Sequence, residues 1–112
     1  LNVVGPFGSV TEELCSKYKL PFISEAFVDR RYNNNLSLVN RNENHALINS
    51  IDKRISQAKL IALDQSVLID GKKFNMHAKT LCIHGDTPNA LESAQLLKAA
   101  LESEGVKFKY YG

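Results

Sequence analysis

Short apolar segments alternate with amphipathic helical segments along this chain, and this alternation limits its fold more than any other feature. The strand patterns cover 1–5, 22–28, 79–83 and 106–110, and the helical patterns cover 9–19, 50–63 and 88–104. Strands separated by a helix pair in parallel, because the helix carries the chain back across the sheet. The sequence therefore predicts an α/β fold with parallel strands and crossover helices, as an open sheet or part of a barrel.

Polar residues mark the start of each expected helix. Ser9 and Glu12 have the spacing of a capping box, and Ser50 is typical of an N-cap. Thr87 is expected to cap the last helix, with Pro88 at its first position. We therefore expect three helices, each with one apolar face against the sheet.

A small β-hairpin is expected between residues 66 and 76. Asp70 and Gly71 separate its two strand patterns, and this dipeptide favours a type I′ turn. Asn33 to Asn35 indicate a loop tip, since Asn adopts left-handed backbone angles readily. The chain has no internal repeat, so we expect residues 1–112 to form a single α/β unit.

Charge, hydropathy and cysteine content indicate which partners and which cellular compartment to expect. The net charge of +2 is too small to indicate nucleic acid or an anionic membrane. No apolar run approaches the ~20 residues that a membrane span needs. Cys15 and Cys82 lie in separate elements without metal or redox spacing, which favours free thiols in the cytoplasm.

Titratable side chains follow two of the expected strands, and such strand ends are where α/β folds bind ligands. If these strands are parallel neighbours, the two ends open onto one face and their side chains can bind an anion, position water and move protons. The side chains are Glu25, Asp29, Arg30, Arg41, His84 and Asp86.

Structural roles remain open for several of these residues. Asp86 precedes a helix, so it is equally well a cap or a turn residue. His84 can transfer protons near neutral pH, but a buried histidine with satisfied hydrogen bonds is the alternative. Arg30 and Arg31 are adjacent, so in an extended segment one of the two points into solvent.

Two parts of the chain resemble motifs of the LamB/YcsF family. The first reads EAFVDRRY over 25–32 and continues through 38–41 and 46–48, and the second reads CIHGDTPNA over 82–90. The similarity extends over nearly the whole chain but corresponds only to the C-terminal portion of the family sequence. We therefore expect a fragment whose start at Leu1 is a cut within a longer chain.

The resemblance implies a fold and an activity. The fold is the C-terminal part of a (β/α) barrel of the glycoside hydrolase and deacetylase type. The activity is that of one component of an ATP-dependent 5-oxoprolinase, which opens 5-oxoproline to L-glutamate together with two further subunits. Because the family's N-terminal motifs are absent, this chain is expected to need the N-terminal part of the barrel and to be inactive alone.

The resemblance also implies roles for individual residues. The catalytic residues it implies are Asp29, His84 and Asp86. The substrate-binding residues it implies are Glu25, Arg30, Tyr32 and Arg41. ATP is the implied co-substrate. The two aspartates would orient His84 and water, or would hold a divalent cation such as Mg²⁺ whose identity the sequence leaves unknown.

This chain departs from the family pattern at three loop positions. Leu36 stands where the family usually has Gly, Asn40 where Pro is common, and His45 where a small residue is frequent. Only Gly takes positive φ freely, so Leu36 predicts a divergent loop.

Two other classes of function are compatible with the sequence. One is a noncatalytic module that binds a partner protein or a small anion, which the absent N-terminal motifs favour. The other is a metal-dependent hydrolase related to deacetylases, which rests on fold similarity alone.

Overall fold

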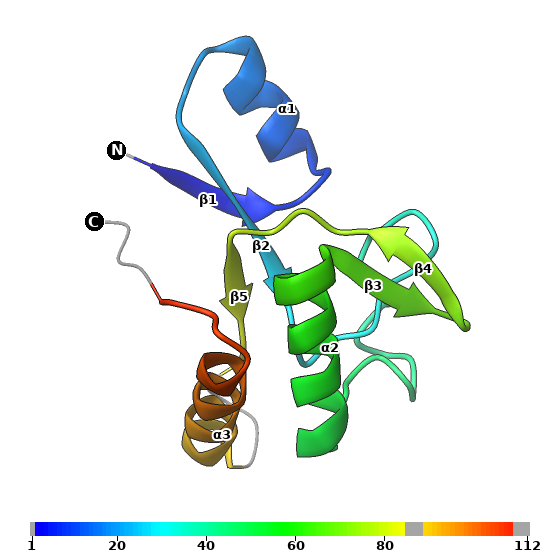
Figure 1. The fold of residues 1–112 in the computed structure, drawn as a ribbon. Coiled ribbons are helices and arrows are strands. Elements are labelled where there is room, and N and C mark those ends of the chain that lie inside the picture. The colour runs from blue at the N-terminus through cyan, green and yellow to red at the C-terminus, as the bar shows by residue number, and fades with distance from the viewer. Residues whose placement is uncertain (1, 85–88, 109–112) are drawn as a thin grey trace.

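The computed structural model describes residues 2–84 and 89–108 and confirms the expected α/β fold with parallel strands and crossover helices. In chain order (Figure 1) the elements are β1 (Val3–Pro6), α1 (Val10–Lys17), β2 (Phe22–Phe27), α2 (Ile51–Asp64), β3 (Ser66–Ile69), β4 (Lys72–Asn75), β5 (Thr80–Cys82) and α3 (Ala90–Ser103).

The central sheet has three strands in the order β1-β2-β5, and both pairings are parallel. Helix α1 connects β1 to β2, and a long loop, α2 and the hairpin connect β2 to β5. The β2–β5 register pairs Glu25 with Thr80 and Phe27 with Cys82. Because paired residues of parallel strands project from the same face, this register decides which side chains can meet at the strand ends.

The predicted N-caps of α1 and α2 are confirmed. Ser9 Oγ accepts a hydrogen bond from the Glu12 amide at 3.3 Å, and Glu12 Oε1 accepts from the Gly8 amide at 3.3 Å. Ser50 Oγ accepts from the Lys53 amide at 3.4 Å. Each cap satisfies an amide that has no partner within its helix.

The predicted hairpin is also confirmed, as an antiparallel pair of β3 and β4. Asp70 and Gly71 have φ values of 51° and 79°. Positive φ at both central residues is what a type I′ turn requires, and this turn matches the twist of the strands.

The start of α3 differs from the prediction. The helix begins at Ala90 with Asn89 as its N-cap, because Asn89 takes a left-handed conformation with φ 61° that interrupts helical geometry. Thr87 and Pro88, expected to begin it, lie outside the described residues.

The expected last strand is not formed over residues 106–108, and 109–110 lie outside the described residues. The Val106 amide instead donates to the Leu101 carbonyl, beside Gly105 at φ 90°. A left-handed glycine with such a bond terminates a helix. The backbone at Val106, which was expected to pair as a strand, therefore forms the C-terminal cap of α3.

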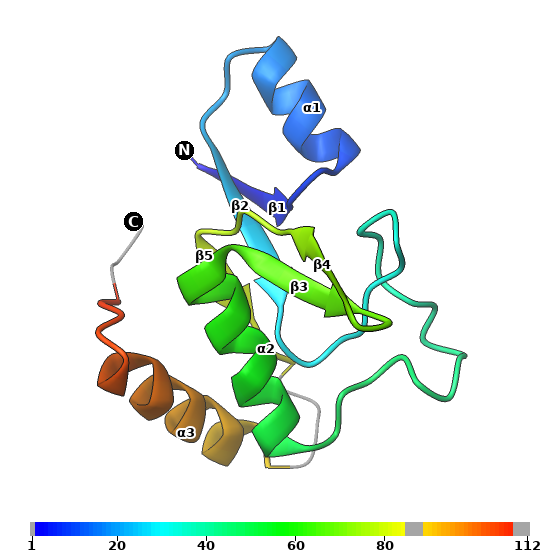
Figure 2. The same ribbon diagram turned by 45° about the vertical axis from the view of Figure 1, so that its right-hand side comes forward.

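Two apolar clusters hold the helices and the hairpin against the sheet. Val28 packs with Ala58 of α2 and with Leu97 and Leu101 of α3. The second cluster joins the sheet to α2 and the hairpin and consists of Ala26, Tyr32, Ile61, Val67, Ile69 and Met76. Figure 2 shows α2 between α3 and the hairpin, with the loop after β2 projecting beyond them.

Alternation along β2 sends its other side chains to the opposite face. Ala26 and Val28 face the helices, so Glu25, Phe27 and Asp29 project from the other side. This second face carries Glu25 and Asp29, two of the residues that the sequence singled out. No helix among the described residues is long and apolar enough to cross a membrane.

Candidate active site

The β2–β5 register brings Asp29 and His84 together at the carboxyl ends of the two strands. Phe27 pairs with Cys82, and two residues further along each chain the same face presents Asp29 and His84. The Val28 amide donates to the Cys82 carbonyl at 3.1 Å, which keeps the chains in register beyond β2. The predicted convergence of these two strand ends is therefore present.

Asp29 holds His84 by both its backbone and its ring. Asp29 Oδ2 accepts from the His84 amide at 2.9 Å and lies 3.0 Å from His84 Nδ1, while Oδ1 lies 3.1 Å from the same nitrogen. A carboxylate only accepts hydrogen bonds, so Nδ1 carries the proton and Nε2 is the basic nitrogen. This tautomer is the one that a general base requires.

Burial and stacking fix the pair further. Asp29 is 1% exposed, and the side chain of His84 is 24% exposed. The Phe27 ring lies nearly parallel to the imidazole, with centroids 5.4 Å apart and planes inclined by 12°. The imidazole is thus held on one edge by the carboxylate and on one face by the phenyl ring.

Gln57 of α2 fixes the segment that carries Asp29. Its Nε2 donates to the Phe27 carbonyl at 2.8 Å and to the Arg30 carbonyl at 3.0 Å. The Asp29 carbonyl accepts from the Ile48 amide at 2.9 Å. Gln57 is not among the residues that the sequence singled out. It lies one turn after the buried Arg54 and directly before the buried Ala58, at the edge of the buried face of α2. A polar side chain in such a place needs a hydrogen-bond partner, and this was the signal available in the sequence.

Arg30 lies in the interior, away from solvent. It is 7% exposed, and its Nη2 donates to the Val39 carbonyl at 2.8 Å. Its Nε is buried without a hydrogen-bond partner among the described residues. The guanidinium ties the long loop to β2, and the substrate-binding role that the resemblance implies stays a prediction.

Tyr32 lies beside the same strand. Its hydroxyl accepts from the Phe27 amide at 2.8 Å. Burial raises the pKa of Tyr32 to about 12, and the charge of Glu25 adds to that rise. The phenol is therefore protonated at neutral pH and keeps an O–H group that can donate.

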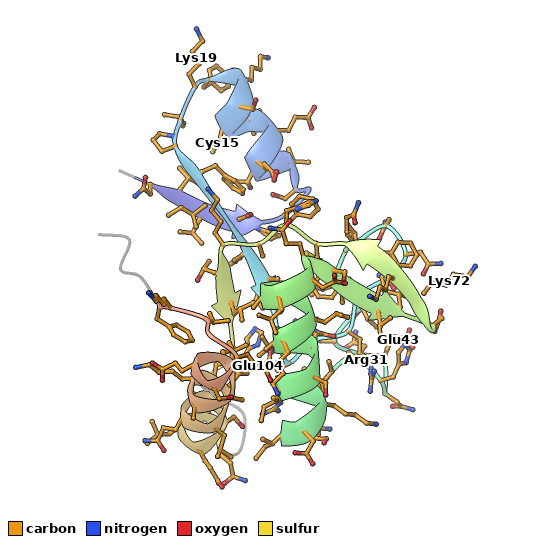
Figure 3. All side chains as sticks on the ribbon, in the orientation of Figure 1. Cys15, Lys19, Arg31, Glu43, Lys72 and Glu104 are labelled. Atoms are coloured by element: carbon orange, nitrogen blue, oxygen red, sulfur yellow. The ribbon has the colours of Figure 1, made fainter. Side chains whose placement is uncertain are left out.

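The remaining predicted residues take different positions. Glu25 is half-buried on the same face as Phe27 and Asp29, whereas Arg41 is exposed in the loop after β2. Figure 3 shows that loop through its labelled residues Arg31 and Glu43. Asp86 lies outside the described residues, so its predicted contact with His84 stays a prediction.

Cys82 belongs to the same face but is a poor nucleophile. Burial raises the pKa of its thiol, and the charges of Glu25 and Asp29 raise it further. A thiol is far less nucleophilic than a thiolate. Cys15 and Cys82 are both free, as the sequence predicted.

The described residues do not form a complete metal site. Within 2–84 and 89–108, no three His, Cys, Asp or Glu side chains gather closely enough to hold an ion. Mg²⁺ in proteins is usually held by one or two carboxylates together with several waters, and Asp29 is the one buried carboxylate among the described residues. The sequence also lacks a Gly-x-x-x-x-Gly-Lys-Ser/Thr loop for phosphates.

The loop between Asn33 and Leu38 accommodates Leu36 in a left-handed conformation. Leu36 has φ 68°, and its amide donates to the Asn33 carbonyl at 2.8 Å. The side chain packs against the cluster that contains Met76. Apolar contact therefore stabilises a backbone geometry that glycine adopts without strain.

A parallel sheet with a carboxylate–imidazole pair at the ends of neighbouring strands defines an α/β protein whose site lies at the strand ends. Within that class, the chain belongs to the LamB/YcsF family, whose family model matches residues 1–111.

Named relatives agree with that membership. The chain is 35% identical over 111 residues to the A subunit of 5-oxoprolinase from Streptomyces avermitilis, covering 96% of this chain and 43% of the relative. It is 34% identical over 106 residues to the A subunit of 5-oxoprolinase from Natranaerobius thermophilus, covering 94% of this chain and 41% of the relative.

A solved structure shares the fold. The lactam utilization protein from Thermus thermophilus superposes with a TM-score of 0.89 at 33% identity, over 99% of this chain and 44% of that protein. The chain thus spans less than half the length of the relatives it matches.

Proposed function

We propose that this chain forms part of the A subunit of an ATP-dependent 5-oxoprolinase, which opens 5-oxoproline to L-glutamate. The observation that carries the proposal is the Asp29–His84 pair, with Nδ1 of the imidazole 3.0 Å from a buried carboxylate oxygen. The names of the relatives and of the lactam utilization protein supply the substrate class.

The proposal extends to the assembly. The three parallel strands form part of a closed (β/α) barrel, and the N-terminal part of that barrel covers the face that carries Glu25, Phe27 and Asp29. Parallel sheets are normally covered on both faces, which supports this arrangement. Two further oxoprolinase subunits complete the enzyme, which works in the cytoplasm.

Hydrolysis of the lactam requires a proton acceptor close to the substrate carbonyl. A lactam is a poor electrophile, and phosphorylation of its oxygen by ATP makes the carbonyl carbon reactive toward water. His84 Nε2 removes the proton from the attacking water, and Asp29 stabilises the resulting imidazolium. The imidazolium then gives its proton to the lactam nitrogen as the C–N bond breaks, which leaves γ-glutamyl phosphate. A second water molecule hydrolyses this acyl phosphate to L-glutamate and inorganic phosphate.

The predicted roles of the other residues belong to the same proposal. Arg41, exposed on the loop, binds the substrate carboxylate or a phosphate oxygen through a bidentate contact, and Asp86 helps to orient water. Arg30 contributes by holding the loop that carries Arg41, because its guanidinium donates to the Val39 carbonyl.

Assays of the complete gene product with its partner subunits test the proposal. His84→Ala and Asp86→Asn should each lower ATP-dependent glutamate formation from 5-oxoproline about 100-fold or more, the usual scale of proton-transfer catalysis. His45→Ala is the matched control, because His45 is exposed.

Near wild-type turnover by both variants would contradict the assignment of this strand end. Tight binding of 5-oxoproline by the wild-type assembly without turnover would instead support the noncatalytic binding module.

A further inference from the structure

A cavity of about 300 Å³ lies at the carboxyl ends of β1 and β2, beneath the loop that contains Leu36. Its walls are mainly apolar and include Phe7, Leu38 and Met76. Phe27 forms another wall, and the same ring stacks on His84. The cavity therefore lies next to the Asp29–His84 pair, separated from it by one side chain.

Two polar groups in the cavity wall are available to a ligand. The Glu25 carboxylate has no hydrogen bond or ion pair with the described residues. The Tyr32 hydroxyl accepts from the Phe27 amide, and its own proton has no acceptor within 2–84 and 89–108. The cavity thus offers one acceptor and one donor.

The other polar side chains of the wall are engaged locally. Ser9 Oγ accepts from the Glu12 amide, and Asn35 Oδ1 accepts from both the amide and the hydroxyl of Ser37. Asn35 and Ser37 are also exposed, whereas Glu25 is half-buried and Tyr32 is buried, so Glu25 and Tyr32 are the groups that depend most on a bound molecule for hydrogen bonds. Glu25 and Tyr32 are also close enough for the carboxylate charge to act on the phenol.

A cyclic amide fits this pair of groups. A five-membered ring forces its amide to be cis, so the N–H and the C=O lie side by side on one edge, whereas open-chain amides are almost always trans. The N–H can donate to a carboxylate while the neighbouring C=O accepts from a phenol. The methylene groups of the ring match the apolar walls.

We propose that this cavity is the lactam-recognition site, in which Glu25 accepts the lactam N–H, Tyr32 donates to the lactam oxygen, and Phe7, Leu38 and Met76 surround the ring. The choice of 5-oxoproline as the ligand rests on the proposed function. Bound in this way, the lactam oxygen lies close to the Phe27 backbone, because the Phe27 amide donates to the same Tyr32 hydroxyl at 2.8 Å.

Calorimetric titration of the complete gene product with 5-oxoproline and with N-methyl-5-oxoproline tests the site. The methyl group removes the N–H, so wild-type protein should bind the methylated lactam about tenfold more weakly or worse, as expected for a lost bond to a charged group. Glu25→Leu should bind the two lactams with nearly equal affinity. Glu43→Leu, an exposed acid on the loop after β2, should keep the wild-type ratio.

Wild-type protein that binds neither lactam, or that binds both with equal affinity, would contradict the proposed site. A Glu25→Leu variant that keeps the wild-type ratio of the two affinities would contradict it as well. If Glu25→Leu does not fold, Glu25→Gln takes its place. Loss of the charge should then reduce the ratio, and an unchanged ratio would overturn the site. Turnover of 5-oxoproline by the wild-type assembly is measured separately, so a failed site and a failed proposed function give different results.

Discussion

The burial of Asp29 and the orientation of His84 depend on the same hydrogen bonds. A carboxylate that is 1% exposed is costly to bury unless hydrogen bonds replace water. Here the His84 amide and the His84 ring provide those bonds. The same contacts orient the imidazole, so removing either side chain should disturb the other.

Tyr32 predicts a loss of stability at high pH. Its folded pKa of about 12 lies above the ordinary value near 10, so its stabilising contribution is complete below about pH 10 and is lost between about pH 10 and 12. The loss amounts to roughly 2 kcal/mol. Denaturant unfolding of the wild type at pH 9 and pH 11.5 measures it.

Tyr32→Phe removes this pH-dependent part, so its stability should fall less than that of wild type over the same range. Tyr18→Phe, at a 65% exposed position, should follow wild type. A Tyr32→Phe variant with the full wild-type pH dependence would show that another group is responsible.

At the scale of single residues, the sequence predicted Asp29 and His84 because both follow apolar strand patterns. It could not predict that Arg30 lies in the interior, since the Val39 carbonyl that accepts its hydrogen bond comes from a loop without regular pattern. Phe27 was identified only as an apolar strand residue, because its stacking on His84 depends on the register between two strands.

At the scale of elements, Gln57 connects α2 to the end of β2. We expect Gln57→Leu to leave the Phe27 and Arg30 carbonyls without their donor and to lower the free energy of unfolding by about 1–3 kcal/mol. Turnover should fall as well, because the segment that holds Asp29 becomes less ordered. Chemical denaturation and steady-state kinetics measure the two effects.

Gln95→Leu is the matched control for this change, because Gln95 is exposed on α3. Equal effects of the two substitutions would argue against a special role for Gln57.

The hairpin turn gives a second test at this scale. Gly71 has φ 79°, and a Cβ there meets no atom within 4 Å, so the cost of Gly71→Ala is backbone strain alone. We expect a loss of about 1 kcal/mol, and a smaller loss for Gly71→Asn, since Asn tolerates left-handed angles. Thermal unfolding compares them; an alanine variant as stable as wild type would contradict the type I′ turn.

The elements themselves were largely predictable, because helix caps and the Asp-Gly turn act locally. The start of α3 was not, since Asn89 takes a left-handed angle that no local pattern required. The final strand was predicted from alternation in 106–110, but alternation alone does not supply a hydrogen-bonding partner. Over 106–108 the backbone closes α3 instead.

At the scale of the whole molecule, β1 and β5 are the outer strands of the described sheet. If the sheet belongs to a closed barrel, the backbone amides on the outer edge of β5 are bonded in the complete gene product. We therefore expect slow hydrogen exchange there, compared with rapid exchange in the isolated 112-residue chain. Equally rapid exchange in both would contradict the barrel.

Under the proposed function, Asp29 and His84 act as one unit in opening the lactam ring. The most direct measurement is the turnover number for glutamate formation by the reconstituted assembly with Asp29→Asn, His84→Ala and the double variant. Each single change should lower turnover about 100-fold or more, and the double variant should be no slower than the slower single variant, because groups that act together are not additive. Near wild-type turnover in either single variant, or a double variant whose loss is the product of the two single losses, would contradict the claim.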